Sequence, residues 1–154
     1  MSYSNCIIET RRFCPDWWGT AEPIVITCFN RDENTKAGKI RNIRFRNISC
    51  KGENGVLIHS TKENMIENVS FENVWVTMSK TSKWDCGLYD LRPCLDYGVE
   101  KIKNSGFFIR NAENVLIEKS GVEWGNVCDE YNKAIDAENA PGLEIIRFTG
   151  KDAH

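Results

Sequence analysis

Two short sequence words alternate along this chain, and their spacing constrains its fold more than any other feature. In the first word, an Asn or Gly precedes two apolar residues that are separated by one position. This word occurs at residues 40–48 (IRNIRFRNI), 66–74 (IENVSFENV), 112–120 (AENVLIEKS) and 140–148 (APGLEIIRF), with a degenerate copy at 4–8 (SNCII). Because the apolar residues repeat with a period of two, each copy predicts a β-strand with one buried face.

The second word follows each copy of the first and also alternates with a period of two. It occurs at residues 22–27 (EPIVIT), 54–60 (NGVLIHS), 105–111 (SGFFIRN) and 133–139 (KAIDAEN). The residues predicted to face the core are Ile24, Ile26, Val56, Ile58, Phe107, Ile109, Ile135 and Ala137. Those predicted to face outward include Leu57, His59, Phe108, Arg110, Asp136 and Glu138. Two strand words that alternate along the whole chain are typical of the successive turns of a solenoid.

The spacing of the words also predicts one long insertion. The two words follow each other closely within 105–120 and within 133–148, whereas a much longer stretch separates 66–74 from 105–111. The surplus, residues 77–104, is predicted to leave the repeat as a loop excursion. Insertions of this kind in solenoids gather on one face, which is often the binding face.

Short strands, corner asparagines and turns of about 22–28 residues fit a parallel β-helix, and no helix-period segment competes with that interpretation. We therefore predict an all-β fold, a parallel β-helix of about five turns, in a single domain over residues 1–154. Asn42, Asn68 and Asn114 hold the same corner in successive turns. They either stack as an amide ladder or are simply tolerant of left-handed turns.

Charge and cysteine content exclude several functional classes. The 20 basic and 22 acidic residues are interspersed, so we expect no nucleic-acid partner. No apolar run reaches the length of a membrane span, and no signal-peptide pattern occurs near Met1, which favours a cytoplasmic protein. With no CxxC motif and two histidines, no metal site is expected. The seven cysteines are predicted to be reduced, with a Cys86–Cys94 disulfide as the alternative in an oxidising compartment.

Four stretches carry a resemblance to a known family. They are residues 17–26 (WWGTAEPIVI), 31–58 (RDENTKAGKIRNIRFRNISCKGENGVLI), 87–94 (GLYDLRPC) and 105–125 (SGFFIRNAENVLIEKSGVEWG). In order and wording they resemble the C-terminal part of bacterial glycoside hydrolase family 28 proteins, the polygalacturonase-like members of the pectin-lyase-like superfamily. The resemblance implies a right-handed parallel β-helix that acts on pectic polysaccharides by inverting hydrolysis, with no cofactor.

The catalytic motifs of that family are not found in this sequence. Inversion needs one carboxylic acid and one carboxylate on opposite faces of the scissile bond. No Asp-Asp pair occurs, Lys36 stands where an Asn-Thr-Asp motif would need Asp, and His59 is not flanked by glycines. Residues 39–41 (KIR) do not match the Arg-Ile-Lys element. We therefore expect no catalytic residues, and a chain that corresponds to the C-terminal part of a longer hydrolase and is inactive alone. Whether it is an enzyme stays open, with relocated acids at Asp85 and Asp90 as a further alternative.

Two segments hold the candidate substrate-binding residues. Trp17, Trp18 and Glu22 precede a strand, and the tryptophans either stack on sugar rings or pack the loop onto the sheet. Tyr89, Asp90 and Arg92 lie in the excursion, where Asp90 and Arg92 either pair with each other or face a cleft. Arg11 and Arg12 are candidates for binding substrate carboxylates.

A function of a different class competes with oligosaccharide binding. The first turn of a solenoid exposes strand edges and apolar surface when no turn lies beside it. The alternative is therefore an interaction module that pairs through this edge with a second copy, giving a homo-oligomer, or with a separate catalytic half.

Overall fold

The computed structural model describes residues 1–16 and 18–154, and these residues form twelve strands and no helix. The expectation of an all-β fold is confirmed. The first sheet contains, in spatial order, β1 (Ser2–Glu9), β3 (Arg41–Gly52), β5 (Ile66–Met78), β9 (Ala112–Glu118) and β12 (Glu144–Ile146), with β10 (Gly121–Trp124) paired to β5. The second contains β11 (Ile135–Glu138), β8 (Phe107–Arg110), β4 (Val56–Ser60) and β2 (Val25–Cys28). Every strand pair in these two sheets is parallel.

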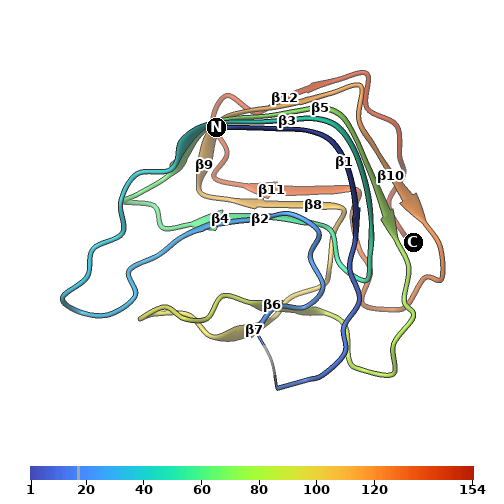
Figure 1. Ribbon diagram of the computed structural model, residues 1–154, viewed down its shortest axis with the longest axis horizontal. Coiled ribbons are helices and arrows are strands. Elements are labelled where there is room, and N and C mark those ends of the chain that lie inside the picture. The colour runs from blue at the N-terminus through green and yellow to red at the C-terminus, as the bar shows by residue number, and fades with distance from the viewer. Residues whose placement is uncertain (17) are drawn as a thin grey trace.

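The chain passes alternately through the two sheets, so equivalent positions of successive passes lie side by side (Figure 1). Arg46 of β3 lies opposite Glu72 of β5, 26 residues later, and the two side chains form an ion pair. β1, β3 and β5 cross the top of Figure 1 and then turn down its right side, while β2, β4, β8 and β11 run beneath them. The two words of the sequence thus correspond to the two sheets.

Asparagines in the left-handed conformation mark the corners at which the strands turn. Asn5, Asn47 and Asn73 have φ values of 58°, 54° and 54°, and Asn42, Asn68 and Asn114 of the other corner have 59°, 56° and 54°. Stacked amides link two members of the second corner: the side-chain amide of Asn68 donates to Asn42 at 3.2 Å. The left-handed conformation is therefore confirmed for Asn42, Asn68 and Asn114, and the amide ladder for Asn42 and Asn68.

The core lies between the two sheets and is built from the inward positions of both words. Phe45 and Phe71 stack with ring centroids 5.0 Å apart, and Phe107 of the second sheet meets Phe71 edge to face at 5.4 Å. Ile24, Ile26, Val56, Ile58 and Ile109 belong to the same buried cluster, and Ile135 packs against it. By contrast, Ile145 of β12 is 48% exposed, because β12 is the last strand of its sheet and lies at its edge.

The segment between β5 and β8 folds back against the second sheet. It contains the antiparallel pair β6 (Leu88–Asp90) and β7 (Val99–Lys101). Tyr89 and Leu91 from this segment form a second buried cluster with Leu57 and Phe108. Leu57, His59 and Phe108 point outward from the main core as predicted, yet they are buried. The excursion covers these side chains, and His59 is 8% exposed.

The two ends of the sheets differ. At the β11–β12 end, residues 147–154 cover the core: Phe148 packs on Phe107 and Asp152 accepts a hydrogen bond from the backbone N–H of Ala134. At the β1–β2 end, Met1, Tyr3 and Val25 are 76%, 45% and 50% exposed. Apolar side chains are thus exposed at the end where, among the described residues, no further strand pairs with β1 or β2.

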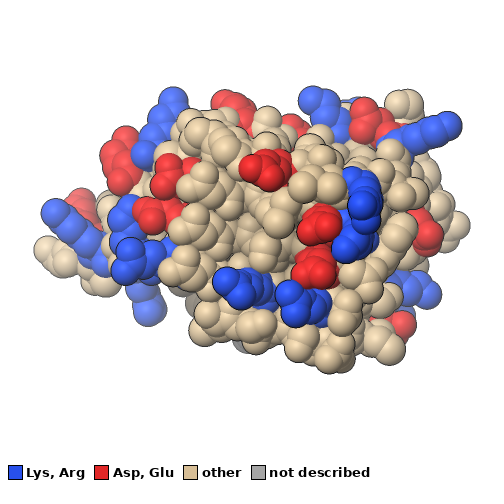
Figure 2. Space-filling view, turned by 90° about the horizontal axis from the view of Figure 1, so that it is seen from above, with Lys and Arg blue, Asp and Glu red and all other residues tan. Residues whose placement is uncertain are grey.

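The outer face of the first sheet carries interspersed charges of both signs (Figure 2). Lys39 pairs with Glu67 at 3.0 Å and Arg46 with Glu72 at 2.9 Å across neighbouring strands. Arg110, on the second sheet, contacts Asp136 at 3.1 Å. Within the described residues no helix has the length and hydropathy to cross a membrane.

Candidate functional site

A hollow of about 570 Å³ lies beside the segment that joins β1 to β2. Its rim carries two exposed aromatic side chains, Phe13 at 74% and Trp18 at 61% exposure. The guanidinium of Arg11 lies 4.7 Å from the centroid of the Phe13 ring. The other lining residues are Glu9, Thr10, Arg12, Cys14, Gly19, Ala21, Glu22 and Val25. We refer to Arg11, Phe13 and Trp18 as the aromatic–arginine rim.

Hydrogen bonds to the first sheet fix where this rim begins. The backbone N–H of Thr10 donates to Lys51 O at 2.8 Å, and its hydroxyl donates to Ala21 O at 2.7 Å. A Cβ atom on Gly52 would lie 2.4 Å from the Thr10 hydroxyl oxygen, so this contact requires a glycine. The rim is also tied to the excursion, because the guanidinium of Arg12 donates to Asp85 O.

Glu22 lies beneath the rim within a buried polar network. Its carboxylate accepts hydrogen bonds from the backbone N–H of Thr20 at 2.8 Å, from the Thr20 hydroxyl, and from the Asn54 amide at 3.3 Å. Burial raises the pKa of Glu22, and the hydrogen bonds from Thr20 offset only part of that increase. The side chain of Glu22 therefore holds the turn before β2 in place, with both carboxylate oxygens already accepting hydrogen bonds.

Asp90 and Arg92 pair with each other, as one of the two interpretations of the sequence anticipated. Two guanidinium nitrogens of Arg92 each donate to the Asp90 carboxylate at 2.8 Å, and Gly19 N–H donates to the same carboxylate at 3.0 Å. Burial acts to raise the pKa of Asp90, but the hydrogen bonds from Arg92 and Gly19 outweigh it, so the pKa lies below its ordinary value. The excursion is thereby joined to Gly19, the residue directly after Trp18.

The remaining predicted site residues occupy different surroundings. Tyr89 is 1% exposed, stacks on Phe108 with centroids 4.3 Å apart, and accepts a hydrogen bond from Ser105 N–H at 3.0 Å. Its place is the second buried cluster. Trp17 lies outside the described residues. The structure therefore brings Glu22, Asp90 and Arg92 together through Gly19 and Thr20, places Trp18 above them on the rim, and puts Tyr89 inside.

Three residues near this site, exposed Phe13 and buried Asn54 and Glu53, were not predicted from the sequence. Phe13 extends the rim, and the only sequence signal for it is an aromatic residue close to two arginines. Asn54 joins Glu22 and Thr20 to Leu88 O. Glu53, 4% exposed, binds Lys80, Thr81 and Ser82 at the start of the excursion. No local pattern marks Glu53 or Asn54, because their partners are distant in the chain.

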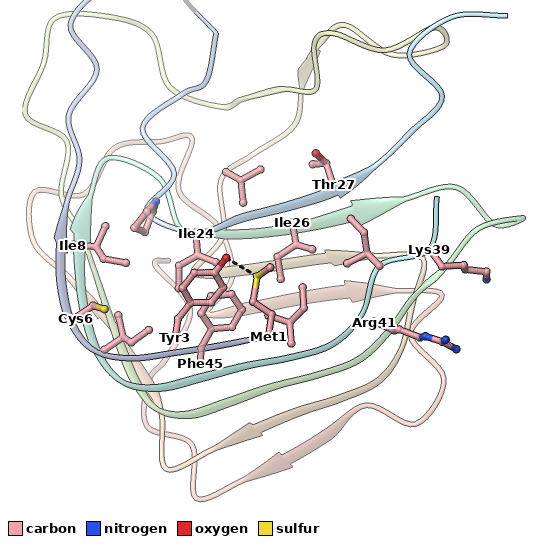
Figure 3. A pocket seen from close by; sticks show the side chains of 15 residues that line it. Met1, Tyr3, Cys6, Ile8, Ile24, Ile26, Thr27, Lys39, Arg41 and Phe45 are labelled. Carbon is pink, nitrogen blue, oxygen red and sulfur yellow. Dashed lines mark hydrogen bonds between the residues drawn. The ribbon is translucent and has the colours of Figure 1, made fainter. Parts of the chain in front are cut away.

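A second hollow, of about 620 Å³, opens at the β1–β2 end and is predominantly apolar (Figure 3). Ile24 and Ile26 of the second sheet face Tyr3 and Phe45 of the first across this space. Tyr3 stacks on Phe45 with centroids 5.3 Å apart, so the column of aromatic rings in the core continues to this open end. Lys39 and Arg41 lie at one corner, and no carboxylate is among the described residues that line it.

Comparisons of the chain with protein-family models, with curated proteins and with solved structures found no match. Among the described residues, no group of three or more His, Cys, Asp or Glu side chains is arranged to hold a metal ion.

Proposed function

We propose that this chain is a right-handed parallel β-helix of the polygalacturonase-like class that binds acidic pectic oligosaccharides at the aromatic–arginine rim and does not cleave them by itself. The observation that carries this proposal is the exposure of Trp18 and Phe13 beside Arg11 on the wall of a hollow. Stacked parallel strands with amide ladders at the corners support the β-helical part of the proposal.

The chemistry of the rim suits a chain of uronic acids. Aromatic faces give apolar contact to the C–H faces of sugar rings. Arg11 brings a guanidinium that can bind a carboxylate through two parallel hydrogen bonds. A rim that combines these groups is expected to prefer acidic over neutral oligosaccharides.

The positions of the carboxylates argue against hydrolysis by this chain alone. An inverting glycosidase needs an acid and a base that both face the scissile bond. Half-buried Glu22 accepts hydrogen bonds from Thr20 and Asn54. Buried Asp90 accepts hydrogen bonds from Gly19 and Arg92, so neither carboxylate is presented to the rim as a free acid or base. Asp85, the other relocated acid considered from the sequence, contributes its backbone carbonyl to Arg12.

Titration calorimetry with oligogalacturonate tests binding at the rim. We expect saturable binding that weakens at least tenfold in Trp18→Ala and in Arg11→Ala, and that weakens similarly when the sugar carboxylates are methyl-esterified. Ile146→Ala and Arg44→Ala, exposed residues of β12 and β3, are the matched controls and are expected to bind like the wild type. Equal affinity for the acidic and the esterified sugar would contradict the role of Arg11.

A reducing-sugar assay on polygalacturonate tests the second half of the proposal. We expect no release above the background of the buffer over a range of pH. Release that disappears in Asp90→Asn would instead assign catalysis to this chain and overturn the proposal that it binds without cleaving.

The open β1–β2 end favours a second candidate function, that of an interaction module. Tyr3 is exposed at the mouth of its hollow and the inward side chains of two edge strands line it, whereas residues 147–154 cover the opposite end. Unpaired strand edges invite pairing with another chain. Because Lys39 and Arg41 line the hollow and no described carboxylate does, like charges would meet in a face-to-face pair of copies. This end therefore fits a β-strand partner of acidic character better than a second copy.

Sedimentation velocity distinguishes an acidic β-strand partner at the β1–β2 end from a second copy of the chain. A monomer that remains monomeric at high concentration, but binds an acidic β-strand polypeptide, is the expected behaviour of the interaction module. Reversible dimers that are lost in Tyr3→Lys would show that a second copy is the partner.

A further inference from the structure

Two cysteines that are distant in the chain lie side by side where the excursion begins. Cys86 Sγ and Cys128 Sγ are 2.8 Å apart, and both residues are half-buried. Cys86 belongs to the stretch between β5 and β6, and Cys128 to the stretch between β10 and β11. The two sulfur atoms would have to approach by less than about 1 Å to reach the length of an S–S bond.

Backbone hydrogen bonds hold the two stretches in register on the side of β5 and β10. Gly125 N–H donates to Met78 O at 2.8 Å, and Lys80 N–H donates to Asn126 O at 2.9 Å. Asn126 N–H also donates to the Ser79 hydroxyl at 3.0 Å. These contacts extend the pairing of β5 with β10 as far as the approach to the two cysteines.

Hydrogen bonds that follow the two cysteines in the chain also hold their stretches together. Gly87 N–H donates to the Asn104 side chain at 2.7 Å, and Asn104 N–H donates to Glu130 O at 2.8 Å. Gly87 has a φ of +75°, and a Cβ atom there would lie 2.7 Å from a carboxylate oxygen of Glu130, so the two stretches approach closely at this point. Tyr131 N–H donates to Cys128 O at 3.0 Å. The two thiols are therefore positioned by fixed backbone on both sides.

We propose that Cys86 and Cys128 form a reversible disulfide that locks the excursion onto the stretch after β10. With a low-molecular-weight disulfide such as oxidised glutathione as the oxidant, one cysteine thiolate attacks it and releases one molecule of thiol. The second cysteine thiolate then attacks the protein sulfur of the mixed disulfide, forms the Sγ–Sγ bond and releases the second thiol. The cysteine pair loses two electrons, the small disulfide gains them, and the two cysteine protons end on the released thiols.

The surroundings of Cys86 set the pH dependence of this exchange. Burial, followed by the hydrogen bond with Cys128, raises the pKa of the Cys86 thiol to about 12. Thiolate is the attacking species, so the exchange is slow near neutral pH and its rate rises as the pH is raised. The other cysteine of the excursion is differently engaged, because the Cys94 thiol donates to Tyr97 O at 3.1 Å. The structure thus favours Cys86–Cys128 over the Cys86–Cys94 pairing considered from the sequence.

Such a bond would act on the candidate site as well as on the excursion. Asp85, next to Cys86, accepts the hydrogen bond from Arg12, and Arg12 lines the same hollow as the aromatic–arginine rim. Oxidation is therefore expected to restrict the motion of the wall that carries Arg12. This consequence depends on the proposed function, whereas formation of the bond does not.

Peptide mapping of the oxidised full chain tests the proposal. Cys86 and Cys94 share the tryptic peptide 84–101, because trypsin does not cleave the Arg92–Pro93 bond, so the experiment uses Cys94→Ser. After incubation with oxidised glutathione at pH 8.5 to 9, the free thiols are alkylated in denaturant. We expect peptide 84–101 to be linked to peptide 120–133, and the link to vanish on reduction. We also expect the melting temperature to rise by about 5–10 °C on oxidation.

Cys128→Ser in the same background is the matched control and is expected to show neither the link nor the rise in melting temperature. Complete alkylation of Cys86 and Cys128 after oxidation would overturn the proposal. A link between Cys86 and Cys94 in the otherwise unaltered chain would also overturn it, as would a rise in melting temperature that persists in the control.

Discussion

Asn47 donates its side-chain amide to the side-chain oxygen of Asn5 across neighbouring strands of the first sheet, at 3.1 Å. Its own oxygen accepts the amide of Asn73 at 3.0 Å, so it is the middle member of a ladder of three residues. In the next two passes of the chain the same corner holds Lys119 and Arg147, which keep the left-handed conformation with φ of 48° and 51°. Backbone conformation and side-chain ladder can therefore be separated at this corner.

Asn47→Ala is expected to lower the free energy of unfolding by about 2 kcal/mol, since alanine loses the ladder and strains the left-handed backbone. Asn47→Gly removes the same two hydrogen bonds but tolerates positive φ, so a loss of about 1 kcal/mol is expected. Urea denaturation of the two variants measures the difference. Equal losses would show that conformation contributes nothing at this corner.

Phe71→Ala tests the aromatic column in the core. Phe71 is fully buried between Phe45 and Phe107, and its truncation is expected to lower the free energy of unfolding by about 3–5 kcal/mol. Phe13→Ala, which alters a 74% exposed ring on the rim, should change stability by less than about 0.5 kcal/mol. Chemical denaturation measures both, and a comparable loss in the two variants would contradict the assignment of Phe71 to the core.

His59 is expected to make the fold sensitive to mild acid. Burial, with a smaller contribution from Arg110, lowers the pKa of His59 to about 4, from an unfolded value near 6.5. The neutral imidazole is favoured in the folded protein, so full stability is present above the unfolded pKa and is lost as the pH falls towards the folded pKa. The expected loss is about 3 kcal/mol between pH 7 and pH 4.

His59→Leu isolates this effect, because only the imidazole titration is removed. Glu53 and Asp90 have lowered pKa values, so their contribution to the stability of the fold is lost as the pH falls below their ordinary pKa values of 4.5 and 3.8. Glu22, whose pKa is raised, has the opposite dependence, with stability lost as the pH rises from 4.5 through its folded pKa. The free energy of unfolding of the variant minus that of the wild type should therefore become more positive from pH 7 to pH 4. A constant difference over that range would contradict a neutral buried imidazole.

Asp90→Asn tests the junction between the excursion and the rim. The change removes the charge that pairs with Arg92 and weakens the acceptor for Gly19 N–H, and we expect a loss of about 2 kcal/mol. Part of the loss should also appear as faster hydrogen exchange at Gly19. Glu100→Gln, on the neighbouring strand β7, is the control and should leave that exchange rate unchanged. Unaltered exchange in Asp90→Asn would mean that this pair does not hold the rim.

The alternation of apolar residues was sufficient to predict the strands of the two words and most of the core, because a period of two is a local property of the chain, but it did not predict β6, β7 or β10. It also identified the corner asparagines, whose residue type is tied to a left-handed backbone. It failed where burial depends on distant chain: Leu57, His59 and Phe108 follow the outward pattern, yet the excursion returns to cover them.

The candidate site was predictable to a similar degree. Asp90 and Arg92 were expected either to pair or to face a cleft, and their separation of two residues left both open until the bidentate contact was seen. Tyr89, directly before Asp90, is instead turned into the second buried cluster. The contact between Cys86 and Cys128 had no sequence signal, because it depends on the pairing of β5 with β10.

Mapping the backbone amides of the isotopically labelled protein by NMR during titration with oligogalacturonate tests the central proposal most directly. We expect chemical-shift changes that concentrate in residues 9–25 and in Asp85 beside Arg12, while the outer face of the first sheet and the β1–β2 hollow remain unchanged. Shifts confined to the β1–β2 hollow, or none at saturating sugar, would contradict it.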